Sequence, residues 1–219
     1  MSGLLSSSED MASVANKSTG VSIGIVTNNQ DPDNEGKVKV RFPMRNSNDE
    51  SYWARVATIM AGNNMGTYFL PEVDSEVLVA FEEGDSEHPI IIGSLWNGKE
   101  PPPETNSDGK NNHRVIKSRA GHTIMLDDDT ENSAAKISIT SGAGHAIILD
   151  DSSGSEKISI IDKSGSNKIV FDSAQNNISI ECSMQLSIKG NQVQIEGTSS
   201  LTLKSSAITT IQGSPVKIN

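Results

Sequence analysis

The second half of the chain alternates apolar and polar residues in short runs. A period of two is the period of a β-strand that buries one face. After residue 120 isoleucine outnumbers leucine 16 to 5, a β-branched bias that favours strands over helices. Ser, Thr, Gln, Lys and Glu fill the positions between. The apolar positions predicted to share a buried face are Ile137, Ile139, Ile158, Ile160, Ile178, Ile180, Leu186, Ile188, Val193, Ile195, Leu201 and Leu203.

The same half repeats itself. GHTIMLDD at residues 121–128 returns as GHAIILDD at 144–151, and a KISI segment follows each copy. A third, altered copy, NKIVFDSAQNNISIE, occupies residues 167–181. Between LDD and ISI the copies become shorter, which indicates that a turn is trimmed while the strands are kept. Repeats of this kind build stacked structures, so each copy is predicted to form one layer of a β-prism.

Each predicted strand offers little apolar surface. A buried side chain contributes roughly 1.5–3 kcal/mol, and an isolated two-stranded ribbon is marginal in water. Nothing else in this half covers the apolar face, because no helix pattern is present and Phe171 is its one aromatic residue. We expect three copies of the chain to wind about a common axis, with the isoleucine rows inward and every strand edge paired with a neighbouring chain. A single-chain solenoid is the alternative.

The first half predicts a different architecture. Five short apolar segments with glycine between them, at residues 21–29, 36–43, 51–58, 76–85 and 89–96, are typical of a small closed barrel such as an OB-fold. Residues 97–112 are rich in proline and polar residues, which indicates a linker. The sequence therefore predicts an all-β chain. It comprises a flexible N-terminal segment over 1–18, an OB-fold barrel over 19–97, a linker over 98–118 and a trimeric β-helix over 119–219.

Composition narrows the function. The chain has 219 residues and a net charge of −10, and residues 1–119 hold 11 Lys or Arg against 17 Asp or Glu. A nucleic-acid surface needs clustered basic residues, so we expect Tyr52, Trp53, Tyr68 and Phe69 to be core or partner contacts, not base-stacking platforms. No apolar run is long enough to span a membrane, and the first residues do not resemble a secretory signal. One cysteine, Cys182, excludes an intrachain disulfide.

Three patterns raise the question of chemistry. His122 and His145 recur in two repeats, and rings of imidazoles in a trimer could hold a metal; the alternative, which we expect, is that each is hydrogen-bonded or solvated. The acidic runs at 127–131 and 150–156 lack a full calcium-loop pattern, so solvated turns are expected. Paired carboxylates could indicate a carbohydrate-degrading tail protein, but sugar-stacking aromatics are missing. The sequence predicts no enzyme, no metal and no cofactor.

Several segments in one order and spacing resemble a known family. GIVTNNQDPDNEGKVKVRFP, SYWARV, PEVDSEVLVAFEEGD and HPIIIGSLWNG resemble the OB-fold domain of contractile-injection spikes, and SRAGHTIMLDD resembles the entry into their β-helix. The family includes phage baseplate assembly protein V and the valine-glycine-repeat spikes of type VI secretion. The resemblance implies a homotrimeric structural spike at the baseplate of a virion tail or injection machine, made in the bacterial cytoplasm.

Such a spike pierces the target cell envelope when the sheath contracts, and it meets the outer membrane only transiently. The resemblance also implies a baseplate hub protein at the barrel end and a small conical tip protein, of the PAAR-repeat type, at the other end. That contact is expected at Pro215, Val216, Lys217, Ile218 and Asn219. The alternative machine is a type VI or extracellular injection system carrying a tip protein or effector.

The chain departs from the family in four places. Few residues precede Val21, so the hub is expected to be a separate polypeptide. Residues 97–120 are too few for an inserted lysozyme domain. No histidine follows His145, so the apical His-x-His iron site of some phage spikes is not expected. Asp74 stands where glycine is expected, which leaves the local turn in question.

Overall fold

The computed structural model describes residues 20–45 and 50–218. The chain divides into two units between Lys110 and Asn111. The regular structure of both units is almost entirely strand, and the helical structure within the described ranges is one 3₁₀ turn, η1 (Glu82–Gly84). None of the described helical structure could cross a membrane. The predicted all-β class is confirmed.

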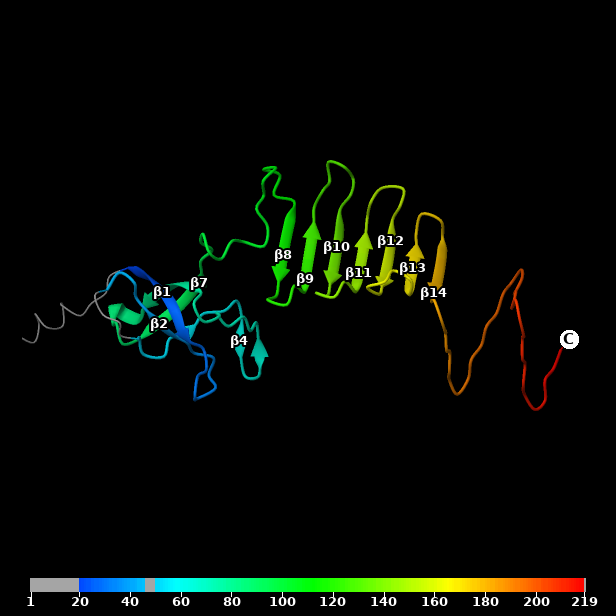
Figure 1. Ribbon diagram of the computed structural model, residues 1–219, viewed down its shortest axis with the longest axis horizontal. Coiled ribbons are helices and arrows are strands. Elements are labelled where there is room, and N and C mark those ends of the chain that lie inside the picture. The colour runs from blue at the N-terminus through cyan, green and yellow to red at the C-terminus, as the bar shows by residue number, and fades with distance from the viewer. Residues whose placement is uncertain (1–19, 46–49, 219) are drawn as a thin grey trace, which may run out of the picture. The chain divides into compact units, whose positions relative to one another are not determined.

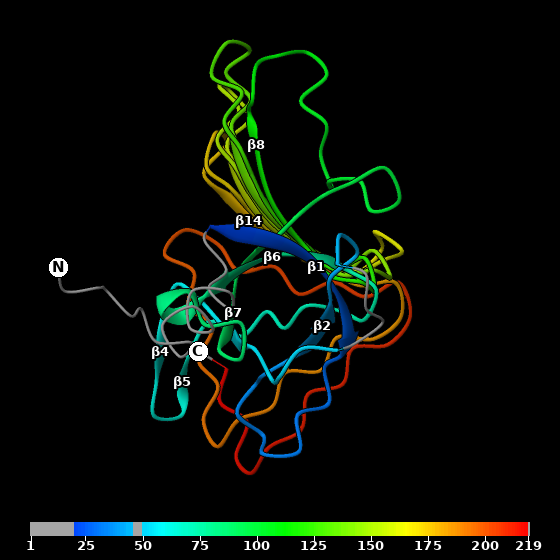
Figure 2. The ribbon, with the colours of Figure 1, turned by 90° about the vertical axis from the view of Figure 1, so that its left-hand side faces the viewer.

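Five strands of the first unit form one sheet that closes on itself (Figures 1 and 2). They are β1 (Val21–Asn28), β2 (Lys39–Arg41), β3 (Arg55–Val56), β6 (Glu76–Phe81) and β7 (Pro89–Ser94), in the order β2-β1-β6-β7-β3. Beyond the ends of β2 and β3, Val38 and Ala54 donate backbone N–H groups to each other's carbonyls, at 3.0 and 2.7 Å. This bridge joins the two sides of the sheet, and each predicted segment contains one of the five strands.

The barrel buries its own core. Along β6 the side chains alternate between half-buried and buried, so Val77, Val79 and Phe81 point inward. The Phe42 and Phe81 rings lie 5.8 Å apart, and the Arg45 guanidinium lies 4.4 Å from the Phe42 ring centre. The buried set is Val26, Val38, Val40, Phe42, Ala54, Val77, Val79, Phe81 and Ile91. Tyr52, Tyr68 and Phe69 are exposed and lie outside this core, so for these three the expected contact with a partner stays a prediction.

Two turns of the barrel show how side chains set local geometry. The Asp31 carboxylate accepts N–H groups from Asp33, Glu35 and Lys37, at 3.1, 2.8 and 3.2 Å, and thereby folds the turn at 31–36. Asp74 has a φ of 73°, in the left-handed region, and its N–H donates to the Val26 carbonyl at 2.8 Å. The turn that glycine would favour is therefore formed with aspartate, which tolerates this conformation better than most residues do.

A small hairpin, not predicted from the sequence, extends from the barrel (Figure 1). It pairs β4 (Ala61–Gly62) with β5 (Met65–Gly66). A Cβ on Gly66, whose φ is 145°, would lie 2.4 Å from the Met60 carbonyl oxygen, so only glycine fits. Each strand is too short to show a periodic pattern.

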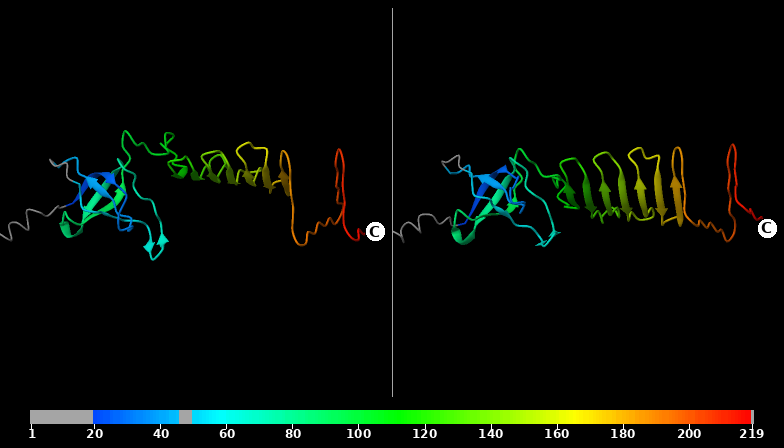
Figure 3. Two further views of the ribbon diagram at one scale, coloured as in Figure 1. Left: turned by 60° about the horizontal axis from the view of Figure 1, so that its bottom comes forward. Right: turned by 90° about the horizontal axis from the view of Figure 1, so that it is seen from below.

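The second unit contains a seven-stranded antiparallel meander (Figures 1 and 3). Each strand lies beside the strands that precede and follow it in the chain, so each repeat is one hairpin: β9–β10, β11–β12 or β13–β14. The strands are β8 (His113–Lys117), β9 (Thr123–Asp127), β10 (Lys136–Thr140), β11 (Ala146–Asp150), β12 (Lys157–Ile161), β13 (Lys168–Asp172) and β14 (Asn177–Glu181). The segment predicted as a linker, 98–118, contains β8.

This pairing corrects one expectation. The sequence predicts an intertwined β-helix in which every strand edge meets a neighbouring chain, whereas both edges of β9 to β13 pair with strands of the same chain. The reason is local, because a short connection after each strand returns the chain directly beside it. From Cys182 the chain changes character. Residues 182–218 contain no strand and follow an extended path (Figure 3).

Candidate functional site

The pairing register places the apolar residues of the sheet in two rows on one face. Directly opposed residues of antiparallel strands share a face, so the second row runs across all seven strands and the first from β9 to β14. We call them the first and second apolar rows. The first consists of Leu126, Ile137, Leu149, Ile158, Phe171 and Ile178, and the second of Ile116, Ile124, Ile139, Ile147, Ile160, Ile169 and Ile180.

This apolar face has no cover from the described part of the chain. Its side chains keep from 39% of their surface accessible at Leu149 to 63% at Ile178, except Ile169, which is half-buried. A shallow hollow of about 560 Å³ lies on the second row, between Ile139 and Ile180. An exposed apolar surface of this extent marks an interaction site, so the face is the strongest candidate surface in the second unit.

The structure brings together the predicted core residues of β10, β12 and β14 and adds others that the sequence reasoning missed. Ile124, Ile147 and Leu149 were missed because GHTIMLDD and GHAIILDD contain consecutive apolar residues. A period of two does not show which of these residues lie on the apolar face. The hairpin register with the KISI strands settles it. The predicted core residues beyond Glu181 lie on no strand and are exposed: Leu186, Ile188, Val193, Ile195, Leu201 and Leu203.

The opposite face carries a row of charges along one end of the strands. His113, Asp127, Lys136, Asp150, Lys157, Asp172 and Asn177 oppose one another in this order, and we call them the charge row. Acidic and basic residues alternate from Asp127 to Asp172, so each inner charge faces two opposite ones. Cross-strand pairs of opposite charge contribute about 0.2–1 kcal/mol each. A slip by one residue would end this alternation, so the row favours the observed register, although a direct ion pair between Lys and Asp forms in it only at Lys136 and Asp127 among the described residues.

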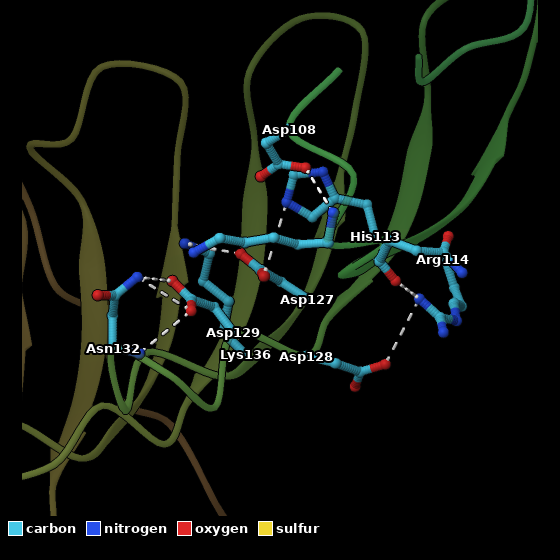
Figure 4. Close-up of polar contacts among 10 residues, drawn as sticks. Asp108, His113, Arg114, Asp127, Asp128, Asp129, Asn132 and Lys136 are labelled. Atoms are coloured by element: carbon cyan, nitrogen blue, oxygen red, sulfur yellow. Dashed lines mark hydrogen bonds and ion pairs between the residues drawn. The ribbon is translucent and has the colours of Figure 1, made fainter. Parts of the chain in front are cut away.

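The first carboxylate of the charge row is nearly buried (Figure 4). Asp127 is 8% exposed and lies between two basic groups. Lys136 Nζ lies 3.4 Å from Oδ2, and His113 Nε2 lies 3.6 Å from Oδ1, farther than a hydrogen bond reaches. Further along, hydrogen bonds from Ser152 lower the pKa of Asp150, and Lys157 and Lys136 add to this effect.

The carboxylates of the acidic run after β9 contact side chains of the same loop and of β8 (Figure 4). Asn132 donates its side-chain amide to both carboxylate oxygens of Asp129, at 3.0 and 2.8 Å. Arg114 Nη1 lies 3.8 Å from Asp128 Oδ2. The loops at this end, residues 128–135, 151–156 and 173–176, become shorter from copy to copy as the sequence indicates. These carboxylates therefore shape and neutralise turns.

The other end of the sheet has three turns of shared design. In each, a side-chain oxygen at the first position accepts the N–H of the last residue: Ser118 from His122 at 3.1 Å, Ser141 from His145 at 3.0 Å, and Asp162 from Asn167 at 3.2 Å. The first carbonyl accepts the N–H of a glycine with positive φ, at Gly121, Gly144 and Gly165. We call them the short turns. They reverse the chain at residues 118–122, 141–145 and 162–167.

The recurring histidines connect successive short turns. His122 Nδ1 accepts the N–H of Gly142 at 3.1 Å, and His145 Nδ1 accepts the N–H of Lys163 at 3.3 Å. In the third copy Asn167 Oδ1 replaces the imidazole and accepts the N–H of Ser183 at 3.1 Å. The residue after Gly in GHTIMLDD and GHAIILDD is therefore a hydrogen-bond acceptor for the next turn. An Nδ1 that accepts carries no proton, so Nε2 bears it.

The third short turn holds a strongly hydrogen-bonded carboxylate. The Asn167 amide, together with Ser164, lowers the pKa of Asp162 from 3.8 to about 2. Asn167 Nδ2 donates to Oδ2 at 2.9 Å, and the Ser164 hydroxyl lies 2.9 Å from each carboxylate oxygen. This turn is therefore formed best with Asp162 ionised.

The predicted tip contact falls at the end of the described chain. Pro215, Val216, Lys217 and Ile218 belong to the extended segment, and Val216 and Ile218 are exposed. Asn219 lies outside the described residues. The structure places these residues together only as chain neighbours.

The first unit is thus a closed five-stranded barrel of the OB type, and a sheet with an open apolar face follows it in the chain. Residues 22–96 match the family described as type VI secretion system/phage-baseplate injector OB domain. The predicted resemblance to injection-machine spikes is confirmed for this part of the chain. The family match ends before β8, so the repeats lie outside it.

Curated relatives point the same way. The type VI secretion system spike protein VgrG1a of Pseudomonas aeruginosa is 37% identical over 75 residues, which are 32% of this chain and 12% of the relative. VgrG3 of Vibrio cholerae is 40% identical over 82 residues, 36% of this chain and 8% of the relative. VgrG2a of P. aeruginosa is 29% identical over 117 residues, 48% of this chain and 13% of the relative. The chain thus matches about a tenth of each relative's length.

Proposed function

We propose that this chain is the structural central spike of a contractile tail or injection baseplate, and that three copies form the spike. One observation carries the proposal: an injector OB domain is joined to a sheet whose apolar face has no cover from residues 20–45 and 50–218 of its own chain. Three such sheets, each turning its apolar rows inward, would form a closed prism with the charge rows outside. The trimer would then bury the isoleucines that one chain leaves open.

The proposed work is mechanical, and the chain catalyses nothing. Sheath contraction drives the prism through the target envelope. Stiffness follows from the backbone pairing within each wall and from the apolar contact between walls. A hub protein would hold the barrels, and a tip protein would contact residues 215–219, where Val216 and Ile218 offer exposed apolar side chains.

The named relatives support a type VI secretion machine as well as a phage baseplate. The family description covers both phage baseplates and type VI secretion, while the named relatives are type VI spike proteins. A type VI or extracellular injection spike that carries a tip protein or effector is therefore the second candidate. A carbohydrate-degrading tail protein has no support in the described residues.

Electron microscopy of sheathed particles from the producing bacterium tests the proposal. A gold label on a tagged chain should mark one end of the sheath, where the baseplate lies. Particles made with Ile139→Asp should lack the spike, because three charges would enter the prism interior. Thr140→Asp, one residue away on the opposite face, is the matched control and should assemble. Absence of the label from sheathed particles would contradict the proposed function.

A further inference from the structure

The first strand of the repeat sheet has one unpaired edge. β8 pairs with β9 on one side, and no strand among the described residues pairs with its other side (Figure 1). Antiparallel strands exchange hydrogen bonds through every second residue. The Ser118 N–H donates to the His122 carbonyl at 2.8 Å, so Ser118 and every second residue before it face β9. Val115 and Lys117 therefore turn their backbone N–H and C=O groups to the open side.

The open edge lies in a basic segment. Residues 110–119 hold four of the 18 Lys and Arg residues of the chain and none of its 28 Asp and Glu residues. Lys117 is exposed and lies opposite the neutral Thr123. Arg114 Nη1 lies 3.8 Å from Asp128 Oδ2, but both side chains are exposed, so water screens this pair (Figure 4). The edge is therefore basic in a chain whose net charge is −10.

The two faces of β8 predict the side chains of an added strand. Ile116 belongs to the second apolar row, whereas His113, Val115 and Lys117 lie on the opposite face, where His113 is the first residue of the charge row. Opposite charges across a strand pair stabilise it, and like charges destabilise it. A strand that extends the sheet would therefore place apolar residues beside Ile116 and acidic residues beside His113 and Lys117.

Strands of the same chain fit this edge poorly. A second β8 would set basic residues against basic residues. β14, whose outer edge is also unpaired among the described residues, carries one acid, Glu181, and its carboxylate lies 3.2 Å from Lys168 Nζ. Residues 182–218 likewise contain one acid, Glu196. The charges of the edge therefore favour a segment of a different protein.

We propose that the open edge of β8 binds an acidic, extended segment of another protein, which adds to the sheet as an eighth strand. Unpaired N–H and C=O groups on a strand edge are a template for a further strand, and strand addition is a common mode of peptide recognition. Val115 and Lys117 supply the backbone groups, and the Lys117 ammonium selects acidic side chains. The inference goes beyond the proposed function, because each chain carries one such edge whether or not three chains close into a prism.

Binding of short labelled peptides to the full-length chain, followed by fluorescence anisotropy, tests the selection of acidic residues. A peptide that alternates Glu and Val should bind at least ~10-fold more tightly than one that alternates Lys and Val. Lys117→Glu should weaken binding of the Glu-Val peptide roughly 10-fold, because attraction becomes repulsion. Lys204→Glu, which changes the net charge equally at an exposed position outside the strands, is the matched control and should bind like the unmodified chain.

A backbone variant separates strand addition from attraction between charges. Val115→Pro removes an N–H on the open side without removing a hydrogen bond to β9, and proline is tolerated on edge strands. This variant should lose binding of the Glu-Val peptide, whereas Val115→Ala keeps the N–H and should retain it. Amide hydrogen exchange on the unmodified chain gives an answer even if Val115→Pro fails to fold, because the Glu-Val peptide should protect the amides of Val115 and Lys117.

The inference would be overturned by equal binding of the Lys-Val peptide, by unchanged binding to a folded Val115→Pro variant, or by unchanged exchange at Val115 and Lys117. A thymidine oligonucleotide is the last probe, because it carries negative charge but no peptide groups. Failure to displace the Glu-Val peptide supports strand addition. Displacement at equal affinity would show an unspecific anion surface and would also overturn the inference.

Discussion

The barrel and the repeat sheet use similar apolar residues with opposite results. In the barrel, Val26, Val77 and Val79 are completely buried by strands of the same chain. In the sheet, Ile147 and Ile160 keep 41% and 45% of their surface accessible. The difference is one of closure, because a sheet that curls on itself makes an inside whereas an open meander leaves its apolar face uncovered. A repeat that is complete in its hydrogen bonds can therefore be incomplete in its packing.

Separating the two units should have the largest effect on folding and on the oligomeric state. A fragment of residues 1–110 should unfold cooperatively on its own, because its core is complete, and should lose the trimeric state. A fragment of residues 111–219 should form trimers or aggregate, since the apolar face would otherwise meet water. Circular dichroism with analytical ultracentrifugation measures both. A folded, monomeric 111–219 fragment would contradict the contrast drawn between the units.

Adjacent isoleucines on opposite faces sharpen the comparison. Ile147 lies on the apolar face, while Ile148 lies on the opposite face and is more buried in the single chain. Ile147→Ala should lower the free energy of unfolding by about 2–5 kcal/mol per chain, as for a buried isoleucine. Ile148→Ala should cost about 1 kcal/mol, typical of a point mutation. Urea unfolding measures both losses of stability. A larger loss for Ile148→Ala than for Ile147→Ala would mean that the apolar face stays open to solvent.

The charge row should contribute moderately to the stability of the repeat sheet and not to that of the barrel. Lys136→Met removes the ammonium from the Asp127 carboxylate and should cost about 1 kcal/mol or more, since Asp127 is nearly buried. Lys157→Met, in the same row but without a direct ion pair within 4.0 Å, serves as the control and should cost less. Thermal unfolding monitored separately for barrel and sheet would show whether the loss is confined to the sheet.

The hydrogen bond that connects successive short turns should contribute still less to the free energy of unfolding. His122→Ala removes the acceptor for the Gly142 N–H and should cost about 0.5–1.5 kcal/mol. His122→Asn should retain most of the stability, because Asn167 already makes the equivalent bond in the third copy. Hydrogen exchange at Gly142 reports the bond directly. Equal protection in both variants would show that the side chain does not cap the next turn.

Acid should weaken the third short turn. The pKa of Asp162 falls from 3.8 to about 2 on folding, so the folded chain binds this proton less readily than the unfolded chain. Its contribution is complete above about pH 4 and is lost as the pH falls towards about 2. Asp162→Asn should abolish this part of the pH dependence, measured by urea unfolding from pH 5 to pH 2. An unchanged profile would contradict the assigned role of Asn167.

Much of the fold follows from sequence patterns that depend on neighbouring residues. The barrel strands are predicted by alternation and turn residues, and the repeats by their copies. The identity of each strand's edge partner is not predicted, because alternation at Ile137 and Ile139 defines a face but not an edge. The charge row was missed for the same reason: Asp127, Lys136 and Asp150 are far apart in sequence and become neighbours only through the register.

The central claim is that one chain leaves an apolar face that other copies of it cover. Native mass spectrometry of the purified full-length chain tests this most directly. A mass of three times the 23.3 kDa of one chain is the predicted result. A monomer at micromolar concentration would contradict the account, because the two apolar rows would then remain exposed to water in the stable form of the protein.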